Sequence, residues 1–290
     1  DEDLVKDGWT DISQRIRDRI VEKMADGSEF TMELADLAFL ESDDEKMEEI
    51  RARCETVVED QQTAQRLKAW YRQLCKRPCF HDEYLQAFNE PGVHLVDTEG
   101  KGVERITETS VVVAGVPYEV DCIIYASGFE VGTDHTRRAG FDVIGRDGEK
   151  LSTHWADGMR TMHGVYVHGF PNAFLVQISQ GGALISNVPH NFTESAATIA
   201  QVVRHTLDGG FQQVEVSKDA EDAWIDLLLG GPGPMLLGTA DCTPGYYNNE
   251  GQDAGPNGRF FVGYPGGAAA YFQYLDGWRA AGTFEGLEFR

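Results

Sequence analysis

The chain has 290 residues, 41% hydrophobic and 25% charged, which is typical of a globular protein with one large core or two smaller ones. Its 25 Lys and Arg against 48 Asp and Glu give a formal charge of −23, and such a surface repels nucleic acid and anionic membranes, so we expect neither as a partner. No apolar run approaches the roughly 20 residues of a membrane span, and the acidic N-terminus lacks signal-peptide character, so we expect a cytoplasmic protein.

The first 75 residues are predicted to be helical. Apolar residues recur every four positions from Ile12 to Met24, and Gly27 is suited to end that helix. Ser42-Asp-Asp-Glu45 has the pattern of a capping box before a second helix, whose apolar face comprises Met47, Ile50, Cys54 and Val57. The same periodicity predicts a further helix over residues 64–74.

Short runs with β propensity begin after residue 75. The pattern predicts strands at residues 93–97, 110–113, 116–120, 122–125 and 173–178. Ala114-Gly115 is suited to a hairpin turn between two of them, and Pro117 suits an edge strand.

Two helices are predicted downstream of these strands. The first begins at a cap formed by residues 191–194 and ends at Gly209-Gly210. The second covers residues 218–229, and its inward face is assigned to four residues: Ala220, Trp224, Leu227 and Leu228. From Gly230 onward the sequence is rich in Gly, Pro and aromatic residues and shows no regular pattern.

The cysteines and the start of the chain carry two further expectations. Five cysteines occur without any Cys-x-x-Cys pair, namely Cys54, Cys75, Cys79, Cys122 and Cys242. An odd number without such spacing predicts reduced thiols rather than a disulfide framework or a zinc site. The first methionine is Met24, within a helical pattern, so we expect the chain to be a fragment of a longer protein.

Cys75-Lys-Arg-Pro-Cys79 contains the first candidate site residues. Arg77 precedes Pro78, which favours an extended backbone. Adjacent side chains on an extended segment point to opposite faces, so one of Lys76 and Arg77 can bind a phosphate while the other faces a reaction centre. On spacing alone, a solvated surface pair is the commoner interpretation.

Two other segments have the pattern of a ligand-binding loop. Asp121-Cys-Ile-Ile-Tyr-Ala-Ser-Gly-Phe129 is a buried-strand pattern that ends in small residues, where open α/β sheets bind ligands. Residues 179–183 link a predicted strand to a helix through a Gly-Gly turn, which lets backbone N–H groups approach a ligand. A tight turn without a ligand is the alternative for this loop.

Several chemistries lack support in the sequence. The histidines show no metal-ligand spacing, and no serine lies in a Gly-x-Ser-x-Gly elbow, which argues against a metal site and against serine nucleophile catalysis. Neither Gly-x-Gly-x-x-Gly nor a P-loop occurs, so a nucleotide-dependent enzyme would need its phosphate-binding residues upstream of Asp1.

In this order and spacing, the motifs resemble the C-terminal half of a flavin-dependent Baeyer–Villiger monooxygenase. The resemblance runs from Trp9 to Leu287 and is densest at residues 71–84, 88–98 and 121–133. It implies an α/β fold that is part of a flavoprotein with two Rossmann-like domains, one for FAD and one for NADPH. Residues 1–75 would be a helical excursion of the NADPH domain, residues 76–120 the end of that domain, and residues 121–290 the C-terminal part of the FAD domain.

The resemblance also implies an activity. NADPH reduces the flavin, O₂ adds to give a C4a-peroxyflavin, and this oxidises a ketone, cyclic or bulky, to an ester or lactone. Arg77 is then the catalytic cation that stabilises negative charge, and Lys76 contacts the NADPH 2′-phosphate. The FAD fingerprint that the family carries near its N-terminus has no counterpart here, so activity would require the missing half.

The resemblance assigns further cofactor-binding residues. Ser127, Gly128 and Phe129 would line the dinucleotide cleft, and four residues would approach the isoalloxazine: Gln180, Gly181, Ser186 and Asn187. Where many members carry a Trp over the nicotinamide, this chain has Tyr246 and Tyr247, either of which could replace it. The alternatives are an N- or S-oxygenating flavin-containing monooxygenase and a non-catalytic binding module.

Overall fold

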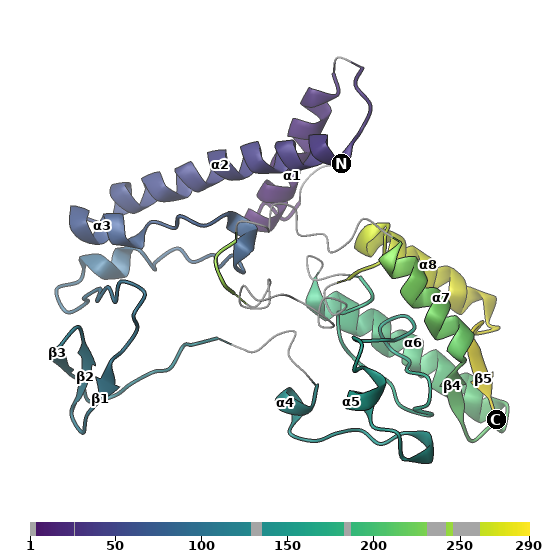
Figure 1. Ribbon diagram of the computed structural model, residues 1–290. Coiled ribbons are helices and arrows are strands. Elements are labelled where there is room, and N and C mark those ends of the chain that lie inside the picture. The colour runs from purple at the N-terminus through teal and green to yellow at the C-terminus, as the bar shows by residue number, and fades with distance from the viewer. Residues whose placement is uncertain (1–3, 26, 129–134, 183–186, 231–241, 246–261) are drawn as a thin grey trace. The chain divides into compact units, whose positions relative to one another are not determined.

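The structure is a computed structural model that describes residues 4–25, 27–128, 135–182, 187–230, 242–245 and 262–290 (Figure 1). The chain divides into two compact units. The first comprises Asp1–Phe129 with Leu237–Gly245, and the second comprises Glu130–Leu236 with Tyr246–Arg290. Among the described residues, no helix combines the length and the apolar character that crossing a membrane requires.

The first unit begins with a pair of helices, α1 (Gly8–Lys23) and α2 (Met32–Val57). The first predicted helix is thus confirmed, and Asp7 caps it by accepting from the Thr10 N–H. Ion pairs connect the two helices, including Arg15 to Glu49 at 3.0 Å. Exposed ion pairs contribute little each, so we attribute the pairing mainly to the apolar residues that the helices bury between them.

The predicted cap at residues 42–45 is wrong, because α2 continues through it. Thr31 is the actual N-cap and accepts from the Leu34 N–H at 3.1 Å. Ser42 and Asp43 are instead buried, with 3% and 5% of their surface exposed. Packing of the middle of α2 therefore outweighs the local capping signal.

The third helix is shorter than predicted. α3 (Gln61–Leu67) ends well before residue 74, and a single 3₁₀ turn, η1 (Gln73–Cys75), follows separately. Another 3₁₀ turn is η2 (Gln86–Asn89).

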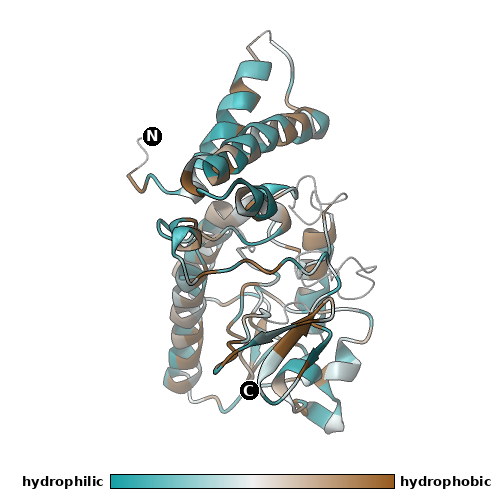
Figure 2. Cartoon of the chain, turned by 90° about the vertical axis from the view of Figure 1, so that its left-hand side faces the viewer, coloured by the Kyte–Doolittle hydropathy of each residue, from teal (hydrophilic) through white to brown (hydrophobic). Residues whose placement is uncertain are grey.

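A small antiparallel sheet follows, with strand order β1 (Arg105–Ile106), β2 (Ser110–Val113) and β3 (Val116–Glu119). The predicted hairpin is confirmed, since Ala114 and Gly115 form its turn with φ of 48° and 77°. Two consecutive positive φ angles are those of a type I′ turn, which matches the twist of paired strands. Pro117 lies on the outer strand β3, and Figure 2 shows β2 as the apolar strand in the middle.

Three predicted strands, at residues 93–97, 122–125 and 173–178, pair with no strand among the described residues. Residues 122–125 have no regular secondary structure, and Ile124 is 87% and Tyr125 74% exposed. A strand exists only where a neighbour accepts and donates its backbone hydrogen bonds, and the sequence pattern cannot supply that neighbour.

The second unit is mostly helical. Its elements are α4 (His135–Ala139), η3 (Arg146–Gly148), α5 (Leu151–His154), α6 (Val188–Asp208), β4 (Val214–Val216), α7 (Lys218–Leu229), α8 (Gly267–Ala281) and β5 (Leu287–Phe289). Strands β4 and β5 pair antiparallel. The core between them and the helices is rich in aromatic residues, with Trp224, Tyr271 and Trp278 all buried.

The helix predictions for this unit are mostly confirmed. α7 has the predicted bounds, but Leu227, expected to face inward, is 43% exposed. α6 begins at Val188, three residues before the predicted cap, because Asn187 is its N-cap. The sequence pattern missed α4, α5, β4, α8 and β5 altogether.

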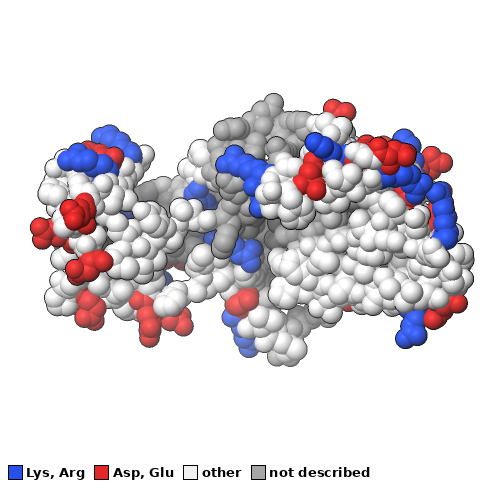
Figure 3. Space-filling model, turned by 90° about the horizontal axis from the view of Figure 1, so that it is seen from below, with Lys and Arg blue, Asp and Glu red and all other residues white. Residues whose placement is uncertain are grey.

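The described residues therefore form a mixed structure of helices with two small antiparallel sheets. The parallel dinucleotide-binding sheets that the resemblance implies are not among them. Charged side chains of both signs are scattered over the face in Figure 3, where the basic ones occur in several separate groups.

Candidate functional site

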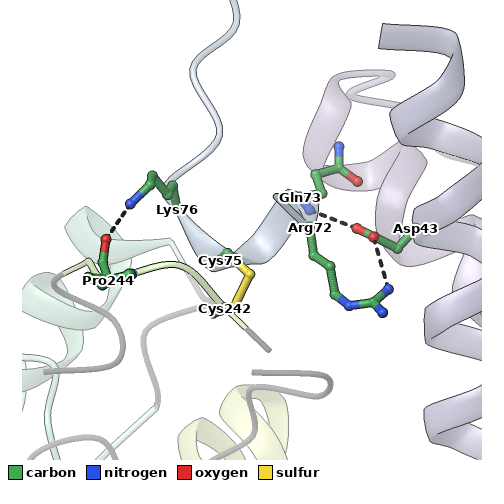
Figure 4. Close-up of a disulfide and its surroundings, with 7 residues drawn as sticks. All are labelled: Asp43, Arg72, Gln73, Cys75, Lys76, Cys242 and Pro244. Carbon is green, nitrogen blue, oxygen red and sulfur yellow. Dashed lines mark hydrogen bonds and ion pairs between the residues drawn. A yellow bond between two sulfur atoms is a disulfide. The ribbon is translucent and has the colours of Figure 1, made fainter. Parts of the chain in front are cut away.

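Lys76 and Arg77 follow the turn η1 in the first unit. Lys76 is extended, with φ −129° and ψ 158°. Its Nζ donates to the carbonyl oxygen of Pro244 at 2.5 Å (Figure 4). Arg77 is exposed, and its guanidinium carbon lies 5.8 Å from the ring centroid of Trp9, within cation–π range. The two cations thus have separate surroundings, as expected for neighbours on an extended segment.

Neither cation forms an ion pair with a carboxylate in the described part of the chain. Lys76 contacts a carbonyl oxygen and lies 5.7 Å from the ring centroid of Tyr71, and the described partner of Arg77 is an aromatic ring. Both charges are therefore available to an anion, although the chain as a whole is strongly acidic.

A disulfide lies directly beside this pair. Cys75 and Cys242 are joined by a disulfide, with their Cα atoms 5.2 Å apart, although their sequence separation is 167 (Figure 4). The prediction that all the cysteines are reduced was therefore wrong. The remaining three, Cys54, Cys79 and Cys122, are free thiols. The spacing of the cysteines in the sequence could not predict this disulfide, because its two cysteines come from distant parts of the chain.

A buried carboxylate anchors the turn that carries Cys75. The backbone N–H of Gln73 donates to Asp43 Oδ1 at 2.7 Å, and Arg72 Nη1 lies 3.5 Å from Asp43 Oδ2 (Figure 4). Burial raises the pKa of the Asp43 carboxyl, and the Gln73 hydrogen bond and the Arg72 charge only partly oppose this. The sequence pattern places Asp43 in a helix cap and gives no sign of this role.

Ser127 and Gly128 follow the predicted strand at residues 122–125, and both are exposed. Gly128 has φ of +87°, a conformation that only glycine adopts without strain. The predicted strand before them is not formed among the described residues, and their cofactor role stays a prediction. Phe129 lies outside the described residues.

Gln180, in the second unit, is 1% exposed, and several hydrogen bonds surround it. Its side chain accepts from Thr161 Oγ1 at 2.7 Å and donates to the Met159 carbonyl at 2.8 Å. Its main chain donates to the Val262 carbonyl and accepts from Trp224 Nε1. These hydrogen bonds of the buried Gln180 hold the loop against neighbouring segments.

The glycines after Gln180 are close to other elements. A Cβ on Gly181 would lie 3.0 Å from Tyr271 Oη, and one on Gly182 would lie 2.3 Å from Asn191 Oδ1. A side chain at Gly182 would therefore clash with Asn191, whereas one at Gly181 would be only tightly packed, and a ligand-binding role for Gly181 stays a prediction.

Asn187 caps α6. Its side-chain oxygen accepts from the His190 N–H at 3.0 Å, and its carbonyl accepts from Asn191 Nδ2. A 21-residue helix begins directly after it, with its positive dipole end at residue 188. Three other predicted residues, Ser186, Tyr246 and Tyr247, lie outside the described residues.

Two further buried carboxylates, Glu215 and Glu221, have no recognisable signal in the sequence. Glu221 accepts from the His168 N–H at 2.9 Å, and Glu215 accepts from the Gly169 N–H at 2.9 Å. Burial raises the pKa of Glu221, but His154, the His168 N–H and Arg160 outweigh it, so the pKa lies below its usual value. These acids hold the start of the Gly169-Phe-Pro-Asn segment against α7 and β4.

The predicted site residues thus divide between the two units. Lys76, Arg77, Ser127 and Gly128 belong to the first, and Gln180, Gly181 and Asn187 belong to the second. Over the ranges that the structure describes, no group of three or more His, Cys, Asp or Glu residues could hold a metal ion.

No protein-family model matches the chain. It is 42% identical over 298 residues to neopentalenolactone D synthase of Streptomyces avermitilis, an alignment that covers 100% of this chain and 48% of that protein. It is 40% identical over 293 residues to Baeyer–Villiger monooxygenase ATR8 of Stachybotrys chlorohalonatus, covering 99% of this chain and 45% of that protein. The chain belongs to the Baeyer–Villiger monooxygenase family. It spans about half the length of the curated relatives that it matches.

Solved structures agree with the family. The polycyclic ketone monooxygenase of Thermothelomyces thermophila matches with a TM-score of 0.81 and 31% identity, over 100% of this chain and 47% of that one. A complex of the monooxygenase OTEMO with FAD and NADP matches with a TM-score of 0.67 over 86% of this chain and 45% of that one, and at 23% identity it shows likeness of fold alone. The described structure is therefore part of the fold of a Baeyer–Villiger flavoprotein.

Proposed function

We propose that the chain is the downstream half of an FAD- and NADPH-dependent Baeyer–Villiger monooxygenase that converts a cyclic or bulky ketone into an ester or lactone with O₂. One observation carries the proposal: Lys76 and Arg77 are adjacent cations on an extended segment, and neither is neutralised by a described carboxylate. Similarity along the whole of this chain to about half of each family member supports it. One of the similar structures is a polycyclic ketone monooxygenase, and this similarity favours a bulky substrate for the proposed enzyme.

Arg77 is the proposed catalytic residue. When bound, FAD reduced by NADPH supplies an activated oxygen from O₂. Negative charge develops on the ketone oxygen as its carbonyl is attacked, and a fixed cation beside that oxygen lowers the barrier. A guanidinium suits this task because it stays protonated when water is excluded, whereas an amine loses its proton more readily on burial. Stacking on Trp9 restricts the Arg77 side chain without consuming its charge.

Lys76 is the proposed contact for the NADPH 2′-phosphate. An ammonium group has three donors, and the Pro244 carbonyl occupies one of them. Two donors remain for phosphate oxygens, while the contact with Pro244 limits the range of positions that Nζ can take.

The other assigned residues fit a dinucleotide to different degrees. Because Gly128 has no side chain, a ligand can approach its exposed backbone closely. The N-terminus of α6 at Asn187 offers a positive dipole to an electron-rich edge of the flavin. Both polar groups of the Gln180 side chain already have protein partners, so Gln180 acts by shaping its loop.

The test compares lactone formation by full-length protein carrying Arg77→Ala, Arg77→Lys or Arg53→Ala. Removing a group that stabilises developing charge lowers kcat by about 10²–10³-fold, and we expect this for Arg77→Ala. Arg77→Lys should retain part of the rate because it retains a charge. Arg53, exposed on α2, is the matched control and should change nothing.

Sulfide oxygenation by the same variants separates the alternatives. If the wild-type protein oxygenates sulfides or amines but no ketone, the N- or S-oxygenating alternative replaces this proposal. If Arg77→Ala forms lactone at the wild-type rate, the catalytic role of Arg77 is wrong. Failure of the full-length protein to bind FAD or oxidise NADPH would favour a binding module.

A further inference from the structure

We propose that Trp224, His163 and Tyr274 form a radical relay, in which Tyr274 replaces an electron lost from the buried indole of Trp224 and passes its phenolic proton to His163. The relay carries an oxidising equivalent from the core of the second unit to a surface residue, where an external reductant can remove it. The inference goes beyond the proposed function and does not depend on it. It needs only a one-electron oxidant, such as a radical derived from peroxide.

The three side chains are in mutual contact. The ring centroid of His163 lies 4.7 Å from that of Trp224 and 5.3 Å from that of Tyr274. The centroids of Trp224 and Tyr274 are 5.6 Å apart. Tyr264 is stacked on both of these rings at 5.7 Å and offers a second path between them. Electrons tunnel readily between aromatic rings at such distances, so an electron can pass from Tyr274 to Trp224.

The two ends of the relay differ in their exposure to solvent. Trp224 on α7 is 5% exposed, and its Nε1 donates to the carbonyl oxygen of Gln180 at 3.1 Å. Tyr274 on α8 is 36% exposed. A radical on Trp224 is therefore shielded from external reductants and would lead to oxidation of the core, whereas a radical on Tyr274 is accessible to them.

His163 is placed to accept the phenolic proton of Tyr274. Its Nε2 lies 3.0 Å from Tyr274 Oη. Burial lowers the pKa of His163 to about 3, so the imidazole is neutral near pH 7. We assign its proton to Nδ1, which has no hydrogen-bond partner among the described residues, because the ring meets Trp224 and Trp278 edge to face and an N–H can point at an aromatic face. Nε2 then accepts from Tyr274.

The relay moves one electron and one proton. An oxidant takes an electron from Trp224 and leaves an indole radical cation. An electron from Tyr274 restores the neutral indole, and the Tyr274 O–H proton passes to His163 Nε2, which gives a neutral tyrosyl radical beside an imidazolium. An external thiolate then gives one electron to the tyrosyl oxygen and becomes a thiyl radical, while the proton returns from His163. All three side chains are thereby regenerated.

The proton acceptor decides where the radical rests. Burial raises the pKa of the Tyr274 phenol, so the phenol keeps its proton until the electron leaves. A phenol that has lost an electron is a very strong acid, and its oxidation is favourable only if the proton can leave. His163 supplies that acceptor within hydrogen-bond distance, without a bulk water molecule having to enter the cluster.

The first measurement uses the full-length protein and needs no substrate. An ultraviolet flash ejects electrons from indoles, dissolved O₂ takes up these electrons, and electron paramagnetic resonance of rapidly frozen samples distinguishes tyrosyl from tryptophanyl radicals. We expect a tyrosyl signal in wild type that Tyr274→Phe diminishes. Tyr84→Phe is the matched control, since Tyr84 is 57% exposed and its described ring partner is Phe88, and it should leave the signal unchanged. A tyrosyl signal as strong in Tyr274→Phe as in wild type would overturn the proposal.

The proton step is tested in two ways. His163→Phe keeps a ring in the cluster but removes the acceptor, so the tyrosyl signal should fall and the tryptophanyl signal should last longer. Heavy water tests the same step without any substitution, and the tyrosyl radical of wild type should appear more slowly in it than in ordinary water. A rise that is equally fast in both solvents would show that no proton moves with the electron, and the role of His163 would be wrong.

The second measurement follows the damage that the relay prevents. After prolonged illumination in the presence of a thiol, mass spectrometry should find more oxidation products of Trp224 in Tyr274→Phe than in wild type. Trp155 packs against a separate apolar cluster around Phe170 and serves as the internal reference, with equal oxidation in both proteins. Equal oxidation of Trp224 in the two proteins would show that Tyr274 does not carry the oxidising equivalent away.

Discussion

The backbone N–H of Gln73 and the buried carboxylate of Asp43 are 2.7 Å apart, and this hydrogen bond connects the turn before Lys76 to the middle of α2. The donor belongs to a residue that is 7% exposed, so water cannot replace the acceptor fully. The position of the candidate site in the first unit thus depends on an acid thirty residues upstream.

Asp43→Ala should lower the free energy of unfolding by about 1–3 kcal/mol, because it leaves a buried N–H without an acceptor. Asp43→Asn should cost less, since its amide oxygen can accept while no charge is buried. Urea unfolding followed by circular dichroism measures both. The neighbouring Asp44, whose side chain is 77% exposed, provides the control Asp44→Ala, expected to change little. Equal losses at positions 43 and 44 would contradict the argument.

Gln180 should prove to be a stability residue of the second unit. Gln180→Ala removes the partners of the Thr161 hydroxyl and the Met159 carbonyl and leaves a cavity, so we expect a loss of about 2–4 kcal/mol. Gln201→Ala, at an exposed position of α6, is the matched control. Thermal and urea unfolding would both report the difference. A Gln180→Ala protein as stable as the control would mean that this hydrogen-bond network is not formed.

His163 should make the second unit sensitive to acid. Burial lowers its pKa from 6.5 to about 3, so below pH 6.5 the unfolded chain takes up a proton that the folded protein does not. Stability is therefore lost as the pH falls from 6.5 towards 3, by about 1.4 kcal/mol per pH unit for this one group.

The comparison of His163→Gln with wild type isolates this contribution. Unfolding free energies are measured in urea at several pH values between 4 and 7. The variant should be less stable than wild type near neutral pH, because it disturbs a packed aromatic cluster, but the difference should shrink as the pH falls. If the unfolding free energies of the two proteins fall equally with pH, His163 takes up its proton in the folded as well as in the unfolded state.

The exposed run at residues 122–125 should behave differently in the chain alone and in the full-length protein. Ile124 is 87% exposed, so Ile124→Glu in the 290-residue chain should change the unfolding free energy by less than about 0.5 kcal/mol and reduce binding of a hydrophobic dye. In the proposed complete enzyme, where we expect this run to be covered, the same change should cost about 2 kcal/mol or more.

Val21→Glu provides the comparison for the dye measurement, since Val21 on α1 is 64% exposed. If Ile124→Glu is as harmless in the full-length protein as in the isolated chain, the run is not an internal strand of the complete enzyme, and its resemblance to a buried strand is misleading.

Short-range signals in the chain were sufficient for the elements that depend on them. The periodicity of α1 and α7 and the turn at Ala114-Gly115 were recognised because a helix face or a hairpin turn is decided within a few residues. The cation pair at Lys76 and Arg77 was likewise evident from adjacent residues and the following proline.

Long-range contacts decided the remainder. The cap signal at Ser42 was overridden because α2 buries that turn, and Cys75 pairs with a cysteine 167 positions further along the chain. Gln180 became a buried hydrogen-bond centre because Met159, Thr161, Trp224 and Val262 converge on it. Neither residue spacing nor secondary-structure propensity predicts these long-range contacts. They form because the whole chain must pack together while its buried polar groups find hydrogen-bond partners.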